Sequence, residues 1–145
     1  MTIIEPSSAD EFYRYYDLRW KILRAPWNQP RGSERDELEQ CSRHLMMIDS
    51  KQAVIAVGRL HFNSIREAQI RYMAVDTDQQ RNGVGTLLLN ALEQQAIKLG
   101  AARIVVEARE SALRFYRKHG YEAECSGHVL FNAVAHVRMS KNTAL

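Results

Sequence analysis

The chain has 145 residues, of which 46% are hydrophobic, and it carries a formal net charge of +3. This length fits one domain spanning residues 1–145, and the hydrophobic content is sufficient for a sizeable core, which argues against disorder. No apolar run approaches the roughly 18 residues that a membrane helix needs, and the first residues lack a signal pattern. The net positive charge is small, and the sequence has no Lys/Arg-rich block. We therefore expect a cytoplasmic protein without membrane or nucleic-acid partners.

The N-terminal third predicts two helices. Residues 7–27 have apolar side chains at helical spacing, and Ser8 and Glu11 form a capping box at the start. Residues 33–42 predict a second, shorter helix, because acidic side chains fill its first turn, where the helix dipole favours them.

The rest of the chain alternates strand and helix patterns. In chain order, we expect strands at 44–50, 52–62 and 68–76, a helix at 83–100, a strand at 102–108, a helix at 111–120, and strands at 121–125 and 135–141. The apolar stripe of the long helix consists of Val84, Leu87, Leu88, Ala91, Leu92 and Leu99. This order predicts an α/β or α+β fold around one mixed sheet.

Two glycines, Gly83 and Gly85, stand in the segment QRNGVG where the long helix begins. Free N–H groups and the helix dipole make a helix N-terminus an anion site, and glycine lets a phosphate approach closely. A tight turn that needs glycine only for its backbone is an equally good interpretation. The sequence has no Gly-Lys-Ser/Thr of a P-loop, and Leu88 stands where a dinucleotide fingerprint needs its third small residue.

Two motifs together resemble one family. QRNGVG follows the strand pattern RYMAVD, and SALRFYRKHGYEA, about thirty residues later, is similar to the family segment xxAxxFYxKxGF. On these residues the chain resembles the GNAT superfamily of N-acetyltransferases, in a small bacterial single-domain branch. The resemblance implies a central mixed, mostly antiparallel twisted sheet of about six or seven strands, flanked by about four helices.

The resemblance also implies a function. Such a protein transfers an acetyl group from acetyl-CoA to a primary amine of a small molecule or peptide, by direct attack in a ternary complex. A non-catalytic acyl-CoA-binding regulatory module is the alternative, and a nucleic-acid-binding domain rests only on the mild positive charge. The oligomeric state stays open, with a homodimer through the C-terminal strands as one option. No metal is expected, because Cys41 and Cys125 lack the spacing of a metal site.

By this resemblance, the backbone of residues 81–86 binds the pyrophosphate, and the backbone of residues 73–75 pairs with the pantetheine arm and polarises the acetyl oxygen. Tyr116 is the expected catalytic residue, donating a proton or a hydrogen bond to the departing thiolate, although a packing role is the alternative. Arg109 stands where many members have an asparagine. The implied cofactor-binding residues are Met73, Ala74, Val75, Gln80, Arg81, Asn82, Gly83, Val84, Gly85, Thr86, Phe115, Tyr116 and Lys118.

The sequence is less informative about the general base and the acceptor. Base candidates, besides a water relay, are Glu34, Glu37, Glu107, His44 and His136, and for each a structural or solvated role is favoured. Four acidic residues are better explained as a solvated helix than as an electronegative lip for a cationic amine: Glu34, Asp36, Glu37 and Glu39. Four aromatic residues either shape the acceptor pocket or belong to the core: Tyr13, Tyr16, Trp20 and Trp27.

Overall fold

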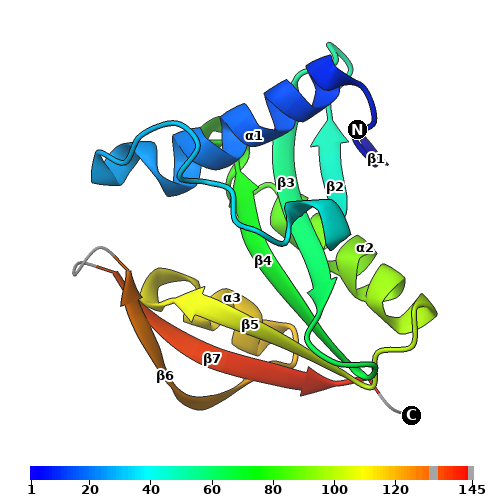
Figure 1. Ribbon diagram of the computed structural model, residues 1–145, viewed down its shortest axis with the longest axis vertical. Helices are drawn as coiled ribbons and strands as arrows, with labels where there is room; N and C mark the ends of the chain where they lie inside the picture. The colour runs from blue at the N-terminus through cyan, green and yellow to red at the C-terminus, as the bar shows by residue number, and fades with distance from the viewer. Residues whose placement is uncertain (131–133, 144–145) are drawn as a thin grey trace.

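The computed structural model describes residues 1–130 and 134–143, and its strands form one seven-stranded sheet in the order β1-β2-β3-β4-β5-β7-β6 (Figure 1). The described part of the chain has three α-helices, where the sequence predicted about four. The elements are β1 Thr2–Ile4, α1 Ala9–Leu23, β2 Arg43–Ile48, β3 Val54–Phe62, β4 Glu67–Val75, α2 Val84–Lys98, β5 Arg103–Arg109, α3 Leu113–Lys118, β6 Glu122–Leu130 and β7 Val134–Asn142. No helix in these described residues is long and apolar enough to cross a membrane.

The sheet divides between β4 and β5. These two strands are its one parallel pair among the described residues, and their pairing runs only from Glu67 opposite Arg103 to Ile70 opposite Val106. Beyond Ile70, β4 stays paired with β3 as far as Val75, and β5 stays paired with β7 as far as Arg109. The two strands therefore diverge, and the sheet opens into a V (Figure 1).

A β-bulge in β4 lies at the start of this divergence. Val57 of β3 is opposite Ala74, and Arg59 is opposite Arg71, so β4 has one more residue than β3 between these two pairs. Tyr72 occupies the bulge with a φ of 56°, which is left-handed backbone that a residue with a large side chain seldom adopts. A bulge bends its strand and redirects side chains, so this one turns β4 away from β5.

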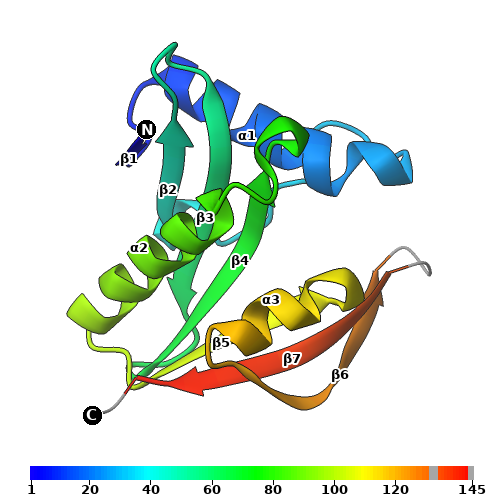
Figure 2. The ribbon, with the colours of Figure 1, turned by 180° about the vertical axis from the view of Figure 1, so that it is seen from behind.

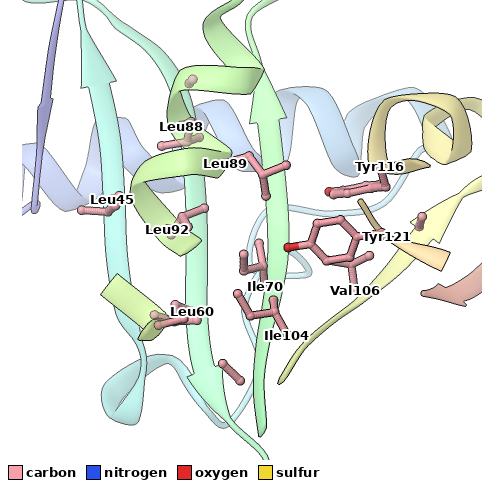
Figure 3. Close-up of a cluster of buried hydrophobic side chains, with 14 of the residues drawn as sticks. Leu45, Leu60, Ile70, Leu88, Leu89, Leu92, Ile104, Val106, Tyr116 and Tyr121 are labelled. Carbon is pink, nitrogen blue, oxygen red and sulfur yellow. The ribbon is translucent and has the colours of Figure 1, made fainter. Parts of the chain in front are cut away.

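The helices cover opposite faces of the sheet. α2 packs over β2, β3 and β4, and α3 packs over β5, on the face turned toward the viewer in Figure 2. α1 crosses β3 and β4 on the other face. One buried cluster fills the α2 and α3 face, where Leu88, Leu89 and Leu92 meet strand residues such as Ile70 (Figure 3). A second cluster, with Tyr15 at its centre, lies under α1.

Two details differ from the sequence predictions. Leu87 and Leu99 were assigned to the apolar stripe of α2, but they are 52% and 44% exposed, and Leu89 and Ala96 complete the buried face instead. The predicted helix at 33–42 is wrong, because this segment consists of turns and one 3-10 turn at Glu39–Cys41. Its acidic side chains do not lie along a solvated helix.

Instead, two acidic side chains of this segment, Asp36 and Glu39, bind buried arginines. Arg59 Nη1 lies 2.6 Å from Asp36 Oδ1 and 2.7 Å from Glu39 Oε2, and Arg19 Nη1 lies 3.0 Å from both Glu39 carboxylate oxygens. Arg71 adds a 3.3 Å contact to Asp36 Oδ2. Arg19 and Arg59 are fully buried, so these carboxylates supply the charges that compensate them. The network fastens the segment between α1 and β2 to the sheet.

Tyr72 at the bulge lies among four guanidinium groups. Its ring centroid is 4.5 Å from Arg19, 4.8 Å from Arg59, 4.7 Å from Arg71 and 5.6 Å from Arg24, each measured to the guanidinium carbon. Its hydroxyl donates to Asp36 Oδ2 at 3.2 Å. These cation–π contacts and this hydrogen bond hold the strained residue in place.

We expect the free energy of unfolding to depend on pH through Asp36. Burial disfavours its ionised form, but hydrogen bonds from Arg59 and from the Leu38 N–H, with the charges of Arg59 and Arg71, lower the pKa of Asp36 from 3.8 to about 2. Ionised Asp36 therefore stabilises the fold above about pH 4, and this contribution of roughly 2 kcal/mol disappears as the pH falls through about 2.

Asp36→Asn should thus lower the unfolding free energy by roughly 2 kcal/mol at pH 7, and by much less at pH 2.5. Urea unfolding at both pH values measures this difference. Glu37→Gln removes an exposed neighbouring carboxylate and should leave both values unchanged. An equal loss at the two pH values would show that Asp36 acts through packing rather than through its charge.

The two glycines at the start of α2 have different conformational demands. Gly83 caps the helix with a φ of 78°, and an added Cβ would meet no atom within 4 Å. At Gly85, a Cβ would make ordinary contacts at 3.5 Å with the Phe115 ring and 3.7 Å with Val75. Backbone geometry thus requires glycine at 83, whereas at 85 the fold itself accepts a side chain.

We accordingly predict that Gly83→Ala lowers the unfolding free energy by about 1 kcal/mol, because L side chains disfavour positive φ. Gly85→Ala should leave it unchanged or raise it slightly, since alanine favours helical backbone. Thermal unfolding of the two variants side by side checks this. Equal losses would mean that the helix start does not have this geometry.

Candidate active site

A cleft opens where β4 and β5 diverge. It has a volume of about 130 Å³, which is below the roughly 300–1,000 Å³ of typical drug-sized ligand pockets. It therefore suits a small reacting group or the end of a longer molecule. Its lining residues come from the end of α1, from β4, from β5 with the turn that follows it, from α3 and from β7: Leu23, Arg24, Ile70, Arg71, Tyr72, Met73, Glu107, Ala108, Arg109, Ala112, Tyr116 and His136.

The β4 wall of the cleft presents backbone rather than a neighbouring strand. β4 pairs with β5 only as far as Ile70, so among the described residues the edge of β4 that faces the cleft has no strand partner from Arg71 to Val75. Backbone N–H and C=O groups require partners when they are buried. An extended molecule with its own amide groups can supply these partners by adding alongside β4, as a strand would.

The start of α2 lies directly after this strand. Within the described residues, the N–H groups of Gly83, Val84, Gly85 and Thr86 have no hydrogen-bond acceptor, since the first bond into the helix is from Leu87 N to Gly83 O at 3.1 Å. Free donors and the positive end of a helix dipole are the features that bind anions at helix N-termini. This segment has both, and its role as a phosphate cradle stays a prediction.

α3 brings Phe115 and Tyr116 to the same region. The Phe115 ring packs beside Gly85, so it links α3 to the start of α2. The Tyr116 hydroxyl is directed from α3 toward β4 (Figure 3), where it donates to the Met73 sulfur at 3.7 Å. Among the described residues this thioether, a weak acceptor, is its only hydrogen-bond partner. The phenol is therefore available to a stronger acceptor in the cleft.

Burial is the cause of the altered acidity of Tyr116. Its side chain is 9% exposed, and burial raises the pKa of Tyr116 to about 12. A phenol with this pKa remains protonated throughout the neutral range, so the Tyr116 hydroxyl keeps its proton and can donate a hydrogen bond there.

The opposite wall of the cleft is rich in arginine. Val106 and Ala108 of β5 face the α3 side, so Glu107 and Arg109 project toward α1. Arg109 Nη2 donates to the Leu23 carbonyl at 3.2 Å, and Arg24 Nη1 donates to the same oxygen at 3.1 Å. Burial, followed by the charge of Arg24, lowers the pKa of Arg109. Two cations therefore converge on one carbonyl oxygen at the cleft.

The sequence-predicted base candidates separate into two groups. Glu107 and His136 line the cleft; Glu107 Oε1 lies 3.6 Å from Arg138 Nη1, and His136 is paired opposite Arg109. The other candidates lie elsewhere: Glu34, Glu37 and His44.

His44 has a structural role under α1. Its Nε2 lies 2.8 Å from the Glu39 carbonyl and its Nδ1 lies 2.8 Å from the Tyr15 hydroxyl. Burial, as the largest contribution, lowers the pKa of His44. The ring is therefore neutral at pH 7, donating from Nε2 to the carbonyl and accepting at Nδ1 from Tyr15.

Several predicted residues do not line the cleft. Gln80 donates from its side chain to the Val75 carbonyl at 3.1 Å and so closes the turn between β4 and α2, and Lys118 is exposed on α3. The four aromatic residues considered for the acceptor pocket are also outside it: Tyr13, Tyr16, Trp20 and Trp27. No sequence pattern assigned Leu23 or Arg24 to the site. Leu23, the last residue of α1, and Arg24, which follows it, both line the cleft.

Comparison with known proteins agrees with this geometry. Residues 12–121 match the acetyltransferase (GNAT) family. The chain is 30% identical over 138 residues to the uncharacterized N-acetyltransferase YjcF of Bacillus subtilis (strain 168), covering 95% of this chain and 94% of that protein.

Solved structures show the same fold at low sequence identity. An aminoglycoside 6'-N-acetyltransferase complexed with coenzyme A superimposes with a TM-score of 0.81 at 17% identity, covering 100% of this chain and 98% of that one. A GNAT family acetyltransferase from Elizabethkingia anophelis with acetyl-CoA bound gives 0.78 at 14% identity, covering 97% of each chain.

The resemblance inferred from the two sequence motifs is thereby confirmed, and so is the predicted mixed sheet. The family match spans β4, the QRNGVG segment and α3. The chain belongs to the GNAT family of acetyltransferases.

Proposed function

We propose that this chain transfers an acetyl group from acetyl-CoA to the primary amine of a small molecule or of a peptide, by direct attack in a ternary complex. The observation that carries this proposal is the split between β4 and β5, with four free amides at one end and the Tyr116 hydroxyl on its wall. Membership of the GNAT family supports the reaction class, and the cleft supports the mechanism.

The features of acetyl-CoA match the chain's free groups one by one. The N–H groups of residues 83–86 suit the pyrophosphate, and the unpaired edge of β4 at Met73, Ala74 and Val75 suits the amides of the pantetheine arm. Arg81 and Asn82 are exposed in the turn before α2, so their side chains can reach a phosphate from solvent. A β4 backbone N–H that has lost its strand partner can polarise the acetyl oxygen.

The role of Tyr116 follows from its pKa. Acetyl-CoA supplies the acetyl group as a thioester, and the amine nitrogen forms the new C–N bond while the C–S bond breaks. Tyr116, with its pKa raised by burial to about 12, is a much weaker acid than an alkyl thiol, whose pKa is about 8.5. A hydrogen bond that stabilises the developing thiolate is thus favoured over complete proton transfer.

The amine must lose a proton, because only a neutral amine attacks. Of the five base candidates from the sequence, Glu107 and His136 are the two that line the cleft. We assign the first transfer of this proton to one of these two side chains, with water completing its path to solvent.

The alternative, a non-catalytic acyl-CoA-binding module, would use the same amide cradle and strand edge. It would not need a buried phenol directed at the strand or a second wall of polar side chains. Both features are present here, and they favour catalysis over simple binding.

The cradle predicts a charge effect at Thr86, in the first turn of α2. Thr86→Glu places a carboxylate where the helix dipole favours it, so the unfolding temperature without ligand should be kept. The same carboxylate repels a pyrophosphate, so the Kd for acetyl-CoA should rise about ten-fold or more. Titration calorimetry measures the Kd, and Thr86→Gln is the neutral control of equal size.

Thermal unfolding with acetyl-CoA, CoA, ATP and NAD tests the ligand itself. A ligand at about 100 times its Kd stabilises the fold by roughly 2.7 kcal/mol. Stabilisation by both CoA species but not by ATP or NAD supports the proposal. No stabilisation by either CoA species at millimolar concentration would refute it.

The Tyr116 hydroxyl can be tested as a catalytic group by removing it. Tyr116→Phe should lower kcat roughly 100-fold, because the thiolate loses its hydrogen-bond donor, while the Kd for acetyl-CoA changes little. Thiol release in the steady state gives kcat, and calorimetry gives the Kd. Phe115→Leu is the matched control on the same helix, and it should affect binding more than kcat. An unchanged kcat in Tyr116→Phe would assign Tyr116 to packing.

A further inference from the structure

The cleft wall carries positive charge, whereas a site that attracts a cationic amine would carry negative charge. The acidic residues that precede β2 were candidates for attracting a cationic amine, but Asp36 and Glu39 are held by Arg19, Arg59 and Arg71. Glu34 is 4% exposed and pairs with Arg35 at 3.4 Å. None of these three carboxylates lines the cleft. Asp36 and Glu39 compensate buried arginines, and Glu34 is paired with the exposed Arg35, so none of the three is available to an acceptor.

Three arginines line the cleft instead: Arg24, Arg71 and Arg109. Arg71 is paired with Asp36, as described above. Arg109 donates to the Leu23 carbonyl, and no carboxylate in the part of the chain that the structure describes forms an ion pair with it. Glu107, the acidic residue of this wall, is paired with Arg138. The balance of formal charge at this wall is therefore positive.

The convergence of Arg24 and Arg109 is what makes this wall a site. Both guanidinium groups reach the same carbonyl oxygen, and Arg24 is only 7% exposed. Two like charges held together out of water are unfavourable, and an anion that binds both removes this cost. Guanidinium groups also match the planar geometry of carboxylate and the oxygens of phosphate.

The location of the pair fits the acceptor and not the cofactor. Arg109 points from β5 toward the end of α1, whereas the free amides of α2 and the Tyr116 hydroxyl lie with the helices of the other face. An amine bound at the split between β4 and β5 would have this pair on the α1 side. The cleft volume of about 130 Å³ favours an acceptor in which a few bonds separate the amine from its anionic group.

We propose that the acceptor amine carries an anionic group, a carboxylate or a phosphate, that binds Arg24 and Arg109 on the α1 side of the cleft. This inference rests on the proposed acetyltransferase function and narrows its substrate class. It disfavours polyamines and other acceptors whose second charge is positive.

Initial rates of thiol release from acetyl-CoA test the inference with amines matched in length. The panel consists of ω-amino carboxylates of increasing chain length, their carboxamides, the corresponding aminoalkylphosphonates and the corresponding diamines. We expect kcat/KM for an anionic amine to exceed that for its carboxamide by roughly 10- to 100-fold, with the diamine slowest. The ratio of carboxylate to phosphonate distinguishes the two anions.

Arg109→Gln supplies the decisive variant, because glutamine can still donate to the Leu23 carbonyl but lacks the charge. It should abolish the preference for the anionic amine by raising its KM, while the KM for acetyl-CoA stays unchanged. Arg109→Lys should keep part of the preference. Arg43→Gln removes an exposed charge on β2 and should have no effect. Wild-type unfolding temperature in each variant confirms an intact fold.

The outcomes separate this inference from the function on which it rests. Carboxamides or diamines acetylated as fast as anionic amines would overturn the inference and leave the acetyltransferase intact. Failure to bind acetyl-CoA would overturn the proposed function first. If no amine of the panel reacts, thermal unfolding is measured with succinate, inorganic phosphate or chloride at equal ionic strength. The rise in unfolding temperature with succinate or phosphate, relative to chloride, then tests the inference. Equal stabilisation of wild type and Arg109→Gln then also overturns the inference.

Discussion

The point at which β4 and β5 stop pairing determines the functional architecture of this protein. Four residue pairs join the two strands, and beyond Ile70 and Val106 each strand follows a different neighbour. The separation leaves a backbone edge of β4 without a strand partner among the described residues and opens the cleft. The cleft lies between the face covered by α2 and α3 and the face covered by α1. The bulge at Tyr72 redirects β4 at this point, and its left-handed backbone costs about 1–2 kcal/mol. Cation–π contacts from the surrounding arginines, together with the hydrogen bond to Asp36, offset that cost.

The ion network around Asp36 and Glu39 serves conformation more than stability. Removing two guanidinium groups from water is costly, and a well-packed apolar cluster of equal volume would stabilise the fold at least as well. The network instead fastens the segment 24–42 to the sheet, and this segment consists of turns and short 3-10 turns without an α-helix or strand. The network also positions the aromatic ring at the bulge. Loss of one partner would leave a buried charge uncompensated, so the network acts as a unit.

Local patterns in the sequence predicted most of the fold. The capping box of Ser8 and Glu11, the strand alternation and the glycines at the start of α2 each describe interactions within a few residues of one another, and the structure confirms these elements. The segment 33–42 shows the limit of such patterns. Acidic residues at a helix start and acidic residues that bind remote arginines look alike in sequence. Asp36 and Arg59 are 23 residues apart, and no local spacing encodes their contact.

In the cleft, too, local motifs could be predicted from the sequence, whereas contacts between remote residues could not. The QRNGVG and FY motifs predicted the positions of the free helix amides and of the buried phenol, because both motifs are short and each carries its own backbone geometry. The arginine wall could not be predicted, since Leu23 and Arg109 are 86 residues apart in sequence. Their proximity depends on α1 crossing the open end of the sheet. The departure from asparagine at Arg109 was the sequence signal for this arginine pair, and its meaning required the position of α1.

The contact of Arg24 and Arg109 with the Leu23 carbonyl also has a mechanical consequence. β4 and β5 meet at the base of the V, and the end of α1 touches both arms near the tip, through Tyr72 on one strand and Arg109 on the other. The three elements form a closed triangle. Strand pairing closes it at the base, hydrogen bonds to the Leu23 carbonyl close it on the β5 side, and the cation–π contact of Arg24 with Tyr72 closes it on the β4 side, so all three sides are present without a bound molecule. A rigid frame of this kind loses little conformational entropy when its substrates enter, which leaves more of their interaction energy for affinity.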